Sequence, residues 1–119
     1  MRPSSAKAKG RRLQNEIQQI LLERFPQFEP DDARPAIMGE SGVDIKMSPF
    51  AQRQFPYSIE AKCQEKLNIW DAWKQALKNM KEKTSPLLIF RRNHHETLVT
   101  MRIDDFFNLL EEANRVDKP

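Results

Sequence analysis

Length, composition and charge narrow the class of protein. The chain has 119 residues, 39% hydrophobic and 31% charged, which predicts one globular domain and excludes an intrinsically disordered protein. No apolar segment at the N-terminus resembles a signal peptide, and the longest apolar run, residues 86–90, is far too short to cross a membrane. The net charge is +3, and residues 1–12 contribute five cations and no acid.

The first third of the chain predicts a basic arm, a helix and a long loop. We expect residues 1–8 to form a disordered arm and the folded domain to span residues 9–115. Apolar residues recur at three- and four-residue steps through 9–25, which predicts a helix that Pro26 ends. Residues 26–42 contain three prolines and two glycines and are expected to form a loop, which in a small domain is often functional.

The remaining residues predict alternating strands and helices. Residues 43–47 and 57–63 alternate apolar and polar residues, as half-buried strands do, with a connection at 49–56. Helical spacing returns over 69–82, and a strand hairpin is expected from 87–91 and 97–101. Asp104 can cap a last helix. The apolar face of that helix would consist of Phe106, Phe107, Leu109, Leu110 and Ala113. The predicted order is α-β-β-α-β-β-α in one domain.

The N-terminal cations suit a polyanion, and nucleic acid is the first candidate. A solvated, frayed terminus accounts for their charge equally well. The cations are Arg2, Lys7, Lys9, Arg11 and Arg12.

Several other polar residues have simple structural explanations. Cys63 is the single cysteine, so no disulfide can form within the chain, and its place on the apolar side of a strand predicts a core position. With His94 and His95 it matches no zinc motif, and the two histidines are expected in a hairpin turn. Glu40 is a further candidate ligand because it precedes Asp44 closely, although a solvated loop residue is the more frequent case.

Two acids and a lysine form the most informative pattern. Asp44 lies on one predicted strand, and after fifteen intervening residues Glu60 lies on the next, followed by Lys62. Residues two apart on a strand share a face, so Glu60 and Lys62 point the same way. Mg²⁺ takes one or two carboxylates together with water and phosphate oxygens, and it makes bound water more acidic. The pattern therefore predicts metal-assisted phosphodiester cleavage, whereas an isolated Glu-x-Lys on an exposed strand is usually a surface ion pair.

Two helical residues are weaker candidates for the same site. Glu16 lies at the edge of the apolar stripe of the first helix, from which it could look toward the sheet, or it is an ordinary surface acid. Gln75 lies nearly opposite the stripe formed by Trp70, Trp73 and Leu77, so helical geometry does not favour a role for it.

These residues together resemble the PD-(D/E)XK nucleases, in particular archaeal-type Holliday junction resolvases and small phage-encoded nucleases. The resemblance covers about residues 9–110. It rests on four segments: Lys9-Gly10 with Glu16, Gly42-Val43-Asp44, Ile59-Glu60-Ala61-Lys62, and Trp73-Lys74-Gln75-Ala76. Val43 stands where the family usually has proline, a position that varies widely.

The resemblance implies a restriction-endonuclease-like α/β fold with a four-stranded mixed sheet flanked by helices. It implies that Asp44, Glu60, Glu16 and the Ala61 carbonyl bind the metal, that Lys62 is the catalytic lysine, and that Gln75 belongs to the site. The expected activity is that of a Mg²⁺-dependent DNA endonuclease, with Mn²⁺ as the alternative metal and no other small-molecule cofactor. The DNA-binding residues would be Lys7, Lys9, Arg11 and Arg12.

The resemblance also implies products with a 5′-phosphate. The expected substrate is branched or Holliday-junction DNA, because so small a domain offers little surface for reading sequence. We expect a homodimer that acts away from membranes, in the cytoplasm of a bacterial or phage-infected host cell. Two alternatives stay open. One is a catalytically silent nucleic-acid-binding subunit of the same fold, and the other is an interaction domain built on Trp70 and Trp73.

Overall fold

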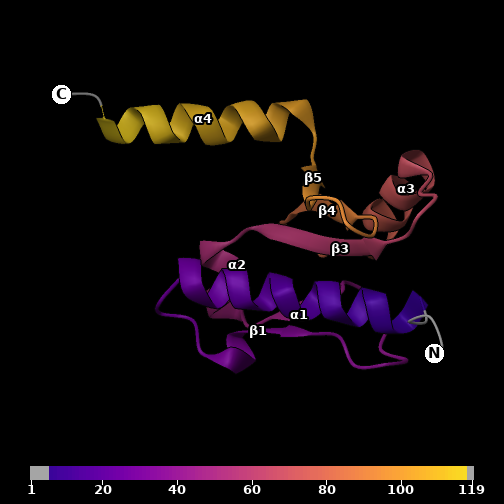
Figure 1. Ribbon diagram of the computed structural model, residues 1–119. Helices are drawn as coiled ribbons and strands as arrows, with labels where there is room; N and C mark the ends of the chain where they lie inside the picture. Colours follow the sequence, from indigo (N-terminus) through magenta and orange to yellow (C-terminus); the bar gives the residue numbers. More distant parts are fainter. Residues whose placement is uncertain (1–5, 118–119) are drawn as a thin grey trace.

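The computed structural model describes residues 6–117 (Figure 1) and is an α/β protein. All seven predicted elements are present in the predicted order, together with three short elements that the sequence pattern did not predict. In chain order the elements are α1 (Ala6–Arg24), the 3₁₀ turn η1 (Pro30–Asp32), β1 (Ala33–Pro35), β2 (Ile45–Met47), α2 (Pro49–Gln54), β3 (Tyr57–Cys63), α3 (Ile69–Asn79), β4 (Ser85–Arg91), β5 (Leu98–Thr100) and α4 (Ile103–Asp117).

The strands form two sheets, so the expectation of one four-stranded sheet is wrong. β1 and β2 are an antiparallel pair, while β3, β4 and β5 form a three-stranded sheet in which β4 is central. β3 runs parallel to β4, and β5 runs antiparallel to it. The backbone N–H of Asp44 donates to the carbonyl of Ile59 at 3.0 Å, a contact at which the chain entering β2 meets β3. That hydrogen bond lies just before β2, which begins at Ile45, so it is not part of a ladder between β2 and β3.

Helix α1 covers one face of the three-stranded sheet. Its buried residues Leu13, Ile17 and Leu21 recur every four positions, so they form one stripe along the helix. That stripe packs in a common core with Ile59 and Ile89. Helix α1 begins at Ala6, so residues 6–8 are helical rather than part of a disordered arm; residues 1–5 of the predicted arm lie outside the described residues.

Helix α3 covers the opposite face of the sheet, through small residues rather than through its tryptophans. Its buried residues are Ala72 and Ala76, whereas Trp70 is 77% exposed and Leu77 is also exposed. The apolar stripe of the sequence is therefore not the face that packs on the sheet. Alanines let the helix approach closely and leave room beside them for polar side chains.

The predicted loop and the predicted connection each contain short regular structure. β1 lies within residues 26–42 and pairs with β2, so that Arg34 stands opposite Lys46. Residues 49–54 form α2, whose first turn is capped by the Ser48 hydroxyl accepting from the Ala51 N–H at 3.1 Å. A three-residue strand that ends in proline and a six-residue helix show too little of a period to be predicted from the sequence.

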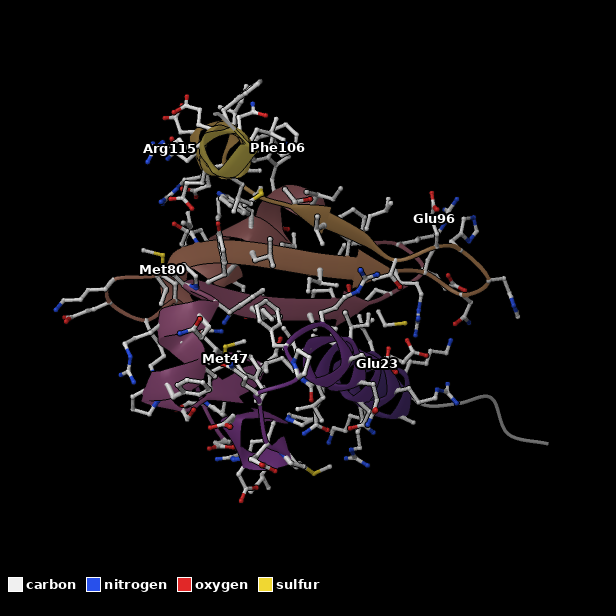
Figure 2. The ribbon with its side chains drawn as sticks, turned by 90° about the vertical axis from the view of Figure 1, so that its left-hand side faces the viewer. Glu23, Met47, Met80, Glu96, Phe106 and Arg115 are labelled. Carbon is white, nitrogen blue, oxygen red and sulfur yellow. The ribbon has the colours of Figure 1, made fainter. Side chains whose placement is uncertain are left out.

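Helix α4 lies beyond the sheet on the side opposite α1 (Figures 1 and 2). The large residues of its predicted apolar face, Phe106, Phe107, Leu109 and Leu110, are 42–51% exposed. Among residues 6–117, no helix has the length and apolar character needed to span a membrane.

Candidate active site

Asp44 is positioned by the turn that leads into β2. Gly42 has φ 93°, in the left-handed region that favours glycine, and this turn directs the chain toward β3. The Asp44 backbone then joins two strands: its N–H donates to Ile59 of β3, and its carbonyl accepts from the Ala36 N–H at 2.8 Å. The α-carbon of Asp44 is therefore fixed from both sides.

The Asp44 carboxylate is held against the backbone of β3. The Ala61 N–H donates to Asp44 Oδ2 at 2.7 Å. The N–H and C=O of one strand residue project toward the same strand edge, so the Ala61 carbonyl points to the edge at which Asp44 lies. This arrangement agrees with the expectation that both residues could serve one ligand.

Glu60 is a buried acid at the middle of β3. It is only 4% exposed, and it points to the α3 side of the sheet, as Ser58 does. Asn79 Nδ2, at the end of α3, donates to Glu60 Oε1 at 3.2 Å, and Lys62 Nζ lies 3.5 Å from Glu60 Oε2. A buried acid needs a charged or hydrogen-bonding partner. Lys62 provides the charge and Asn79 the hydrogen bond, both on the α3 side of the sheet.

The two carboxylates share an electrostatic environment that favours a cation. Burial raises the pKa of Glu60, the negative charge of Asp44 raises it further, and Asn79 and Lys62 lower it only in part. Burial also raises the pKa of Asp44, against the opposing effects of the Ala61 N–H and of Lys62 and Lys46. Neighbouring buried carboxylates that resist ionisation are stabilised in their charged form by an added positive ion.

The donor set fits a hard divalent cation. Two carboxylates and a backbone carbonyl are oxygen ligands of the kind that Mg²⁺ accepts, with water or phosphate completing its octahedron. In the described part of the chain no group of three or more His, Cys, Asp and Glu side chains could hold a metal. Any cation here would therefore rely on Asp44, Glu60 and backbone oxygen.

Lys62 and Gln75 line one hollow on the α3 side of the sheet. This hollow of about 290 Å³ also includes Gln64, Lys66 and Asp71 among its lining residues. Gln75 is half-buried because the helix face that carries it, with Ala72 and Asn79, is the one turned toward the sheet. The structure therefore brings Gln75 beside Lys62, although the helical pattern did not favour it.

Four of the N-terminal cations line two different hollows, while Arg2 lies outside the described residues. Lys7 and Arg11 line a hollow of about 270 Å³ together with Asp44 and Gln14. Lys9 and Arg12 also lie on α1, but they line a different hollow, together with Arg91, His94 and His95. Of these two pairs, Lys7 and Arg11 therefore share a hollow with Asp44.

Glu16 lies apart from the other candidate ligands. Its carboxylate pairs with Arg91, which follows the buried part of β4, and Arg91 also interacts with Cys63. Cys63 belongs to the core on the α1 side, whereas Glu60 faces α3. The structure thus places Glu16 on the opposite face of the sheet, in a structural ion pair.

Glu40 lies at the edge of the site. It lines the same hollow as Asp44 but is bound by Arg34 at 3.2 Å and by the Ile37 N–H at 2.8 Å. The hydrogen bond from Arg34, with that from Ile37, lowers the pKa of Glu40 to about 2. Glu40 therefore remains ionised and fixes the loop before Asp44.

Sequence reasoning missed Asn79 and Lys46. Asn79 follows Gln75 by four positions and Ala72 by seven, so a helical wheel centred on the alanines would have found it. Lys46 lies two positions after Asp44, lowers the pKa of Asp44, and donates to the Ser41 carbonyl. A search for alternating charges along β2 would have identified Lys46.

Comparisons with protein-family models, with curated proteins and with solved structures found no significant match.

Proposed function

We propose that this protein is a metal-dependent DNA endonuclease of the PD-(D/E)XK type. One observation carries the proposal: Asp44 and Glu60 come together from adjacent segments, with Lys62 Nζ 3.5 Å from Glu60 and the Ala61 N–H bound to Asp44. An ordinary surface ion pair would not bury its acid to 4% exposure or place a second carboxylate beside it.

Asp44, Glu60 and the Ala61 carbonyl would hold Mg²⁺, or Mn²⁺ in its place. When bound, such a cation supplies Lewis acidity and lowers the pKa of water. The protein contributes the position of the two carboxylates: Asn79 orients the carboxylate of Glu60, and the Ala61 N–H orients that of Asp44. Glu16 is left out of this ligand set because Arg91 binds it.

Lys62 would act as the catalytic lysine. Its side chain is 28% exposed, so its ammonium group can reach a substrate while remaining next to Glu60. A cation in this position stabilises negative charge that develops on a phosphate and can orient an attacking water. Gln75 shares the hollow with Lys62 and offers an amide for positioning a phosphate or water.

Lys7 and Arg11 would bind the phosphates that flank the cleaved bond, since they line the hollow that includes Asp44. Lys9 and Arg12 would contact the backbone farther along. Phosphate contacts position a duplex without reading bases, which suits shape-dependent recognition of branched or junction DNA. The proposal includes a homodimer, which would cut two strands symmetrically, and products with a 5′-phosphate.

A catalytically silent nucleic-acid-binding subunit is the second candidate. It is favoured by one observation: with Glu16 paired to Arg91, the site retains two carboxylates, and one of these already pairs with Lys62. Such a subunit would bind DNA through the same cations but would not need Asp44.

Incubation with labelled linear, nicked, flapped and four-way DNA tests the proposal. An endonuclease cuts at least one of these substrates in Mg²⁺ and none in EDTA. A silent subunit binds DNA in both conditions and cuts none, which would overturn the enzymatic proposal.

A further inference from the structure

Helix α4 presents an apolar stripe that the rest of residues 6–117 leaves uncovered. Ile103, Phe106, Phe107 and Leu110 follow the i, i+3, i+4, i+7 spacing of a helix that buries one face. They are 70%, 47%, 51% and 45% exposed, respectively. An isolated helix of this length is marginal in water, so α4 needs a partner surface for stability.

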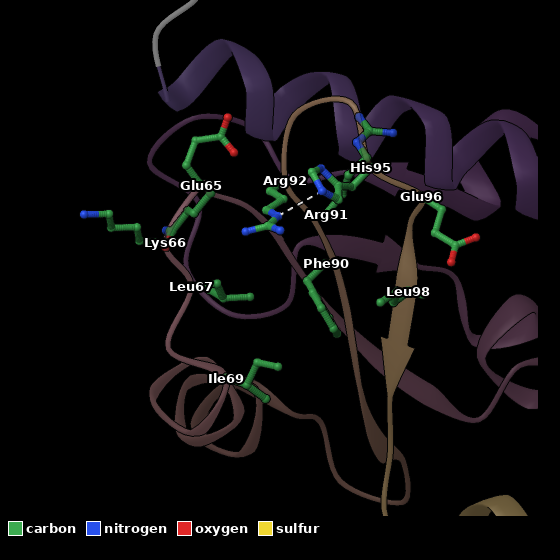
Figure 3. A pocket seen from close by; sticks show the side chains of 11 residues that line it. Glu65, Lys66, Leu67, Ile69, Phe90, Arg91, Arg92, His95, Glu96 and Leu98 are labelled. Carbon is green, nitrogen blue, oxygen red and sulfur yellow. Dashed lines mark hydrogen bonds between the residues drawn. The ribbon is translucent and has the colours of Figure 1, made fainter.

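The chain also carries a groove that suits such a stripe. A hollow of about 500 Å³ opens between the start of α3 and the β4–β5 hairpin. Leu67, Ile69, Phe90 and Leu98 point into it (Figure 3). Polar residues surround this apolar floor, with the cations Lys66, Arg91 and Arg92 outnumbering the acids Glu65 and Glu96. We call it the α3–β5 groove.

A chain's own α4 is badly placed to fill its own groove. Burial and then the negative charges of Asp105 and Glu112 raise the pKa of Tyr57, so α4 lies near the start of β3. The groove lies near the other ends of β3 and β4. Only Met101 and Arg102 separate β5 from α4, and Met101 packs on the core. Folding back would require a complete reversal within two residues, and short hinges of this kind favour exchange between copies.

Charge indicates what kind of partner α4 fits. Residues 103–115 carry four acids and one arginine, a net charge of −3, so the rest of the +3 chain has a net charge of +6. An acidic helix is repelled by nucleic acid and by anionic lipid, whereas it is attracted to another copy of this basic domain.

We propose that α4 of one copy docks in the α3–β5 groove of a second copy, and the reverse, in a symmetric exchanged dimer. A stable interface buries on the order of 1,600 Å² in total, and a buried aromatic residue accounts for about 150–250 Å² of that. Two α4 helices, each with five exposed large apolar residues, supply surface of this order together with the two grooves. The proposal concerns assembly alone and holds whether or not the protein cuts DNA.

The test measures mass by light scattering over a range of concentrations. The wild-type protein is expected at twice 14.0 kDa. The double variant Phe106→Gln/Phe107→Gln alters α4, and Leu98→Gln and Ile69→Gln each alter the groove. Each should raise the dissociation constant about 30-fold or more, as loss of a central interface residue does. Ile20→Gln is the matched control, since Ile20 is 52% exposed on α1, away from both surfaces.

Mixing the variants identifies the contact itself. The α4 variant keeps an intact groove, and a groove variant keeps an intact α4, so an equimolar mixture should recover part of the doubled mass. The substituted residues are at least 39% exposed, and far-UV circular dichroism checks that each variant is folded. A wild-type monomer at every concentration would overturn the proposal. Groove variants that remain dimeric would also overturn it. The same holds if those variants lose DNA affinity while their mass is unchanged, because the groove would then serve DNA binding and not assembly.

Discussion

The Ala61 N–H donates to the carboxylate of Asp44 at 2.7 Å, so the backbone of β3 fixes the acid that precedes β2. Ala61 stands between Glu60 and Lys62, and therefore all three candidate catalytic side chains are positioned by one stretch of β3. Substitutions that keep an acceptor at position 44 should preserve this link.

Neutralising Glu60 should stabilise the metal-free protein. Because its pKa is raised, mainly by burial, the folded state holds more protons than the unfolded state between the ordinary value of 4.5 and the raised value. The free energy of unfolding therefore falls as pH rises through that window. We expect Glu60→Gln to be more stable than wild type at neutral pH, and the difference to disappear below about pH 4.5. Urea unfolding in EDTA at several pH values measures this.

Glu40 provides the control with the opposite sign. Its pKa is lowered to about 2, so it stabilises the folded state above its ordinary value of 4.5, and this contribution is lost as pH falls toward 2. Glu40→Gln should therefore be less stable than wild type at neutral pH, with a small difference because Glu40 is solvent-exposed. Equal behaviour of the two variants would contradict this account of the site's electrostatics.

Divalent cations should raise the melting temperature through Asp44 and Glu60. Ligand at a hundred times its dissociation constant stabilises the folded state by about 2.7 kcal/mol. Asp44→Asn and Glu60→Gln should lose most of the Mg²⁺-dependent shift in differential scanning fluorimetry. Glu16→Gln should retain it, because Arg91 already binds Glu16. A shift that depends on Glu16 would show that the ligand set is different.

Removing Asn79 should change the pH dependence of cleavage. Asn79 donates to Glu60 and lowers its pKa, so Asn79→Ala should raise that pKa further. The acidic limb of a kcat/KM profile should then move to higher pH. Asn15→Ala, an exposed substitution on α1, should leave the limb in place. If both profiles coincide with wild type, Glu60 does not control the acidic limb.

Lys7 and Arg11 should contribute more to the salt dependence of DNA binding than Lys9 and Arg12 do, because they line the hollow that includes Asp44. Removing one phosphate-binding cation reduces the log–log salt slope by about 0.9 for duplex DNA. Replacing both Lys7 and Arg11 by alanine should flatten the slope by up to about two units, on every DNA sequence alike. The matched pair Lys9→Ala/Arg12→Ala tests the other hollow and should have the smaller effect. Binding is measured in Ca²⁺ so that no DNA is cut, and an unchanged slope in the first variant would remove its proposed role.

The sequence predicted β3 to the residue because the alternation of apolar and polar residues continues over all of 57–63. β1 was not predicted because it has three residues and ends in proline. The sequence pattern did not identify the face of α3 that packs on the sheet, because the large apolar residues of the helix are not on that face. In fact Ala72 and Ala76 pack on the sheet while Trp70 is exposed.

That Glu60 and Lys62 point the same way was predictable because residues two apart on a strand share a face. Asp44 joins them through a tertiary contact, since it lies just before β2 and accepts from the Ala61 N–H. The place of Glu16 was not, since its partner Arg91 is 75 residues away and no local pattern joins them. Asn79 was likewise hidden, because its role depends on which face of α3 packs. Long-range pairing and helix rotation are set by the folded core, not by the local sequence.

The most direct test of the proposed site compares metal binding with cleavage in two variants. Lys62→Met should still bind Mg²⁺, because it keeps both carboxylates, but should cut DNA about 10²-fold more slowly or worse. Asp44→Asn should lose both binding and cleavage, while Lys83→Ala should behave as wild type. Single-turnover cleavage of labelled DNA in Mg²⁺, with metal affinity measured on the same preparations, gives both values. Wild-type cleavage by Lys62→Met, or cleavage by wild-type protein in EDTA, would contradict the proposed mechanism.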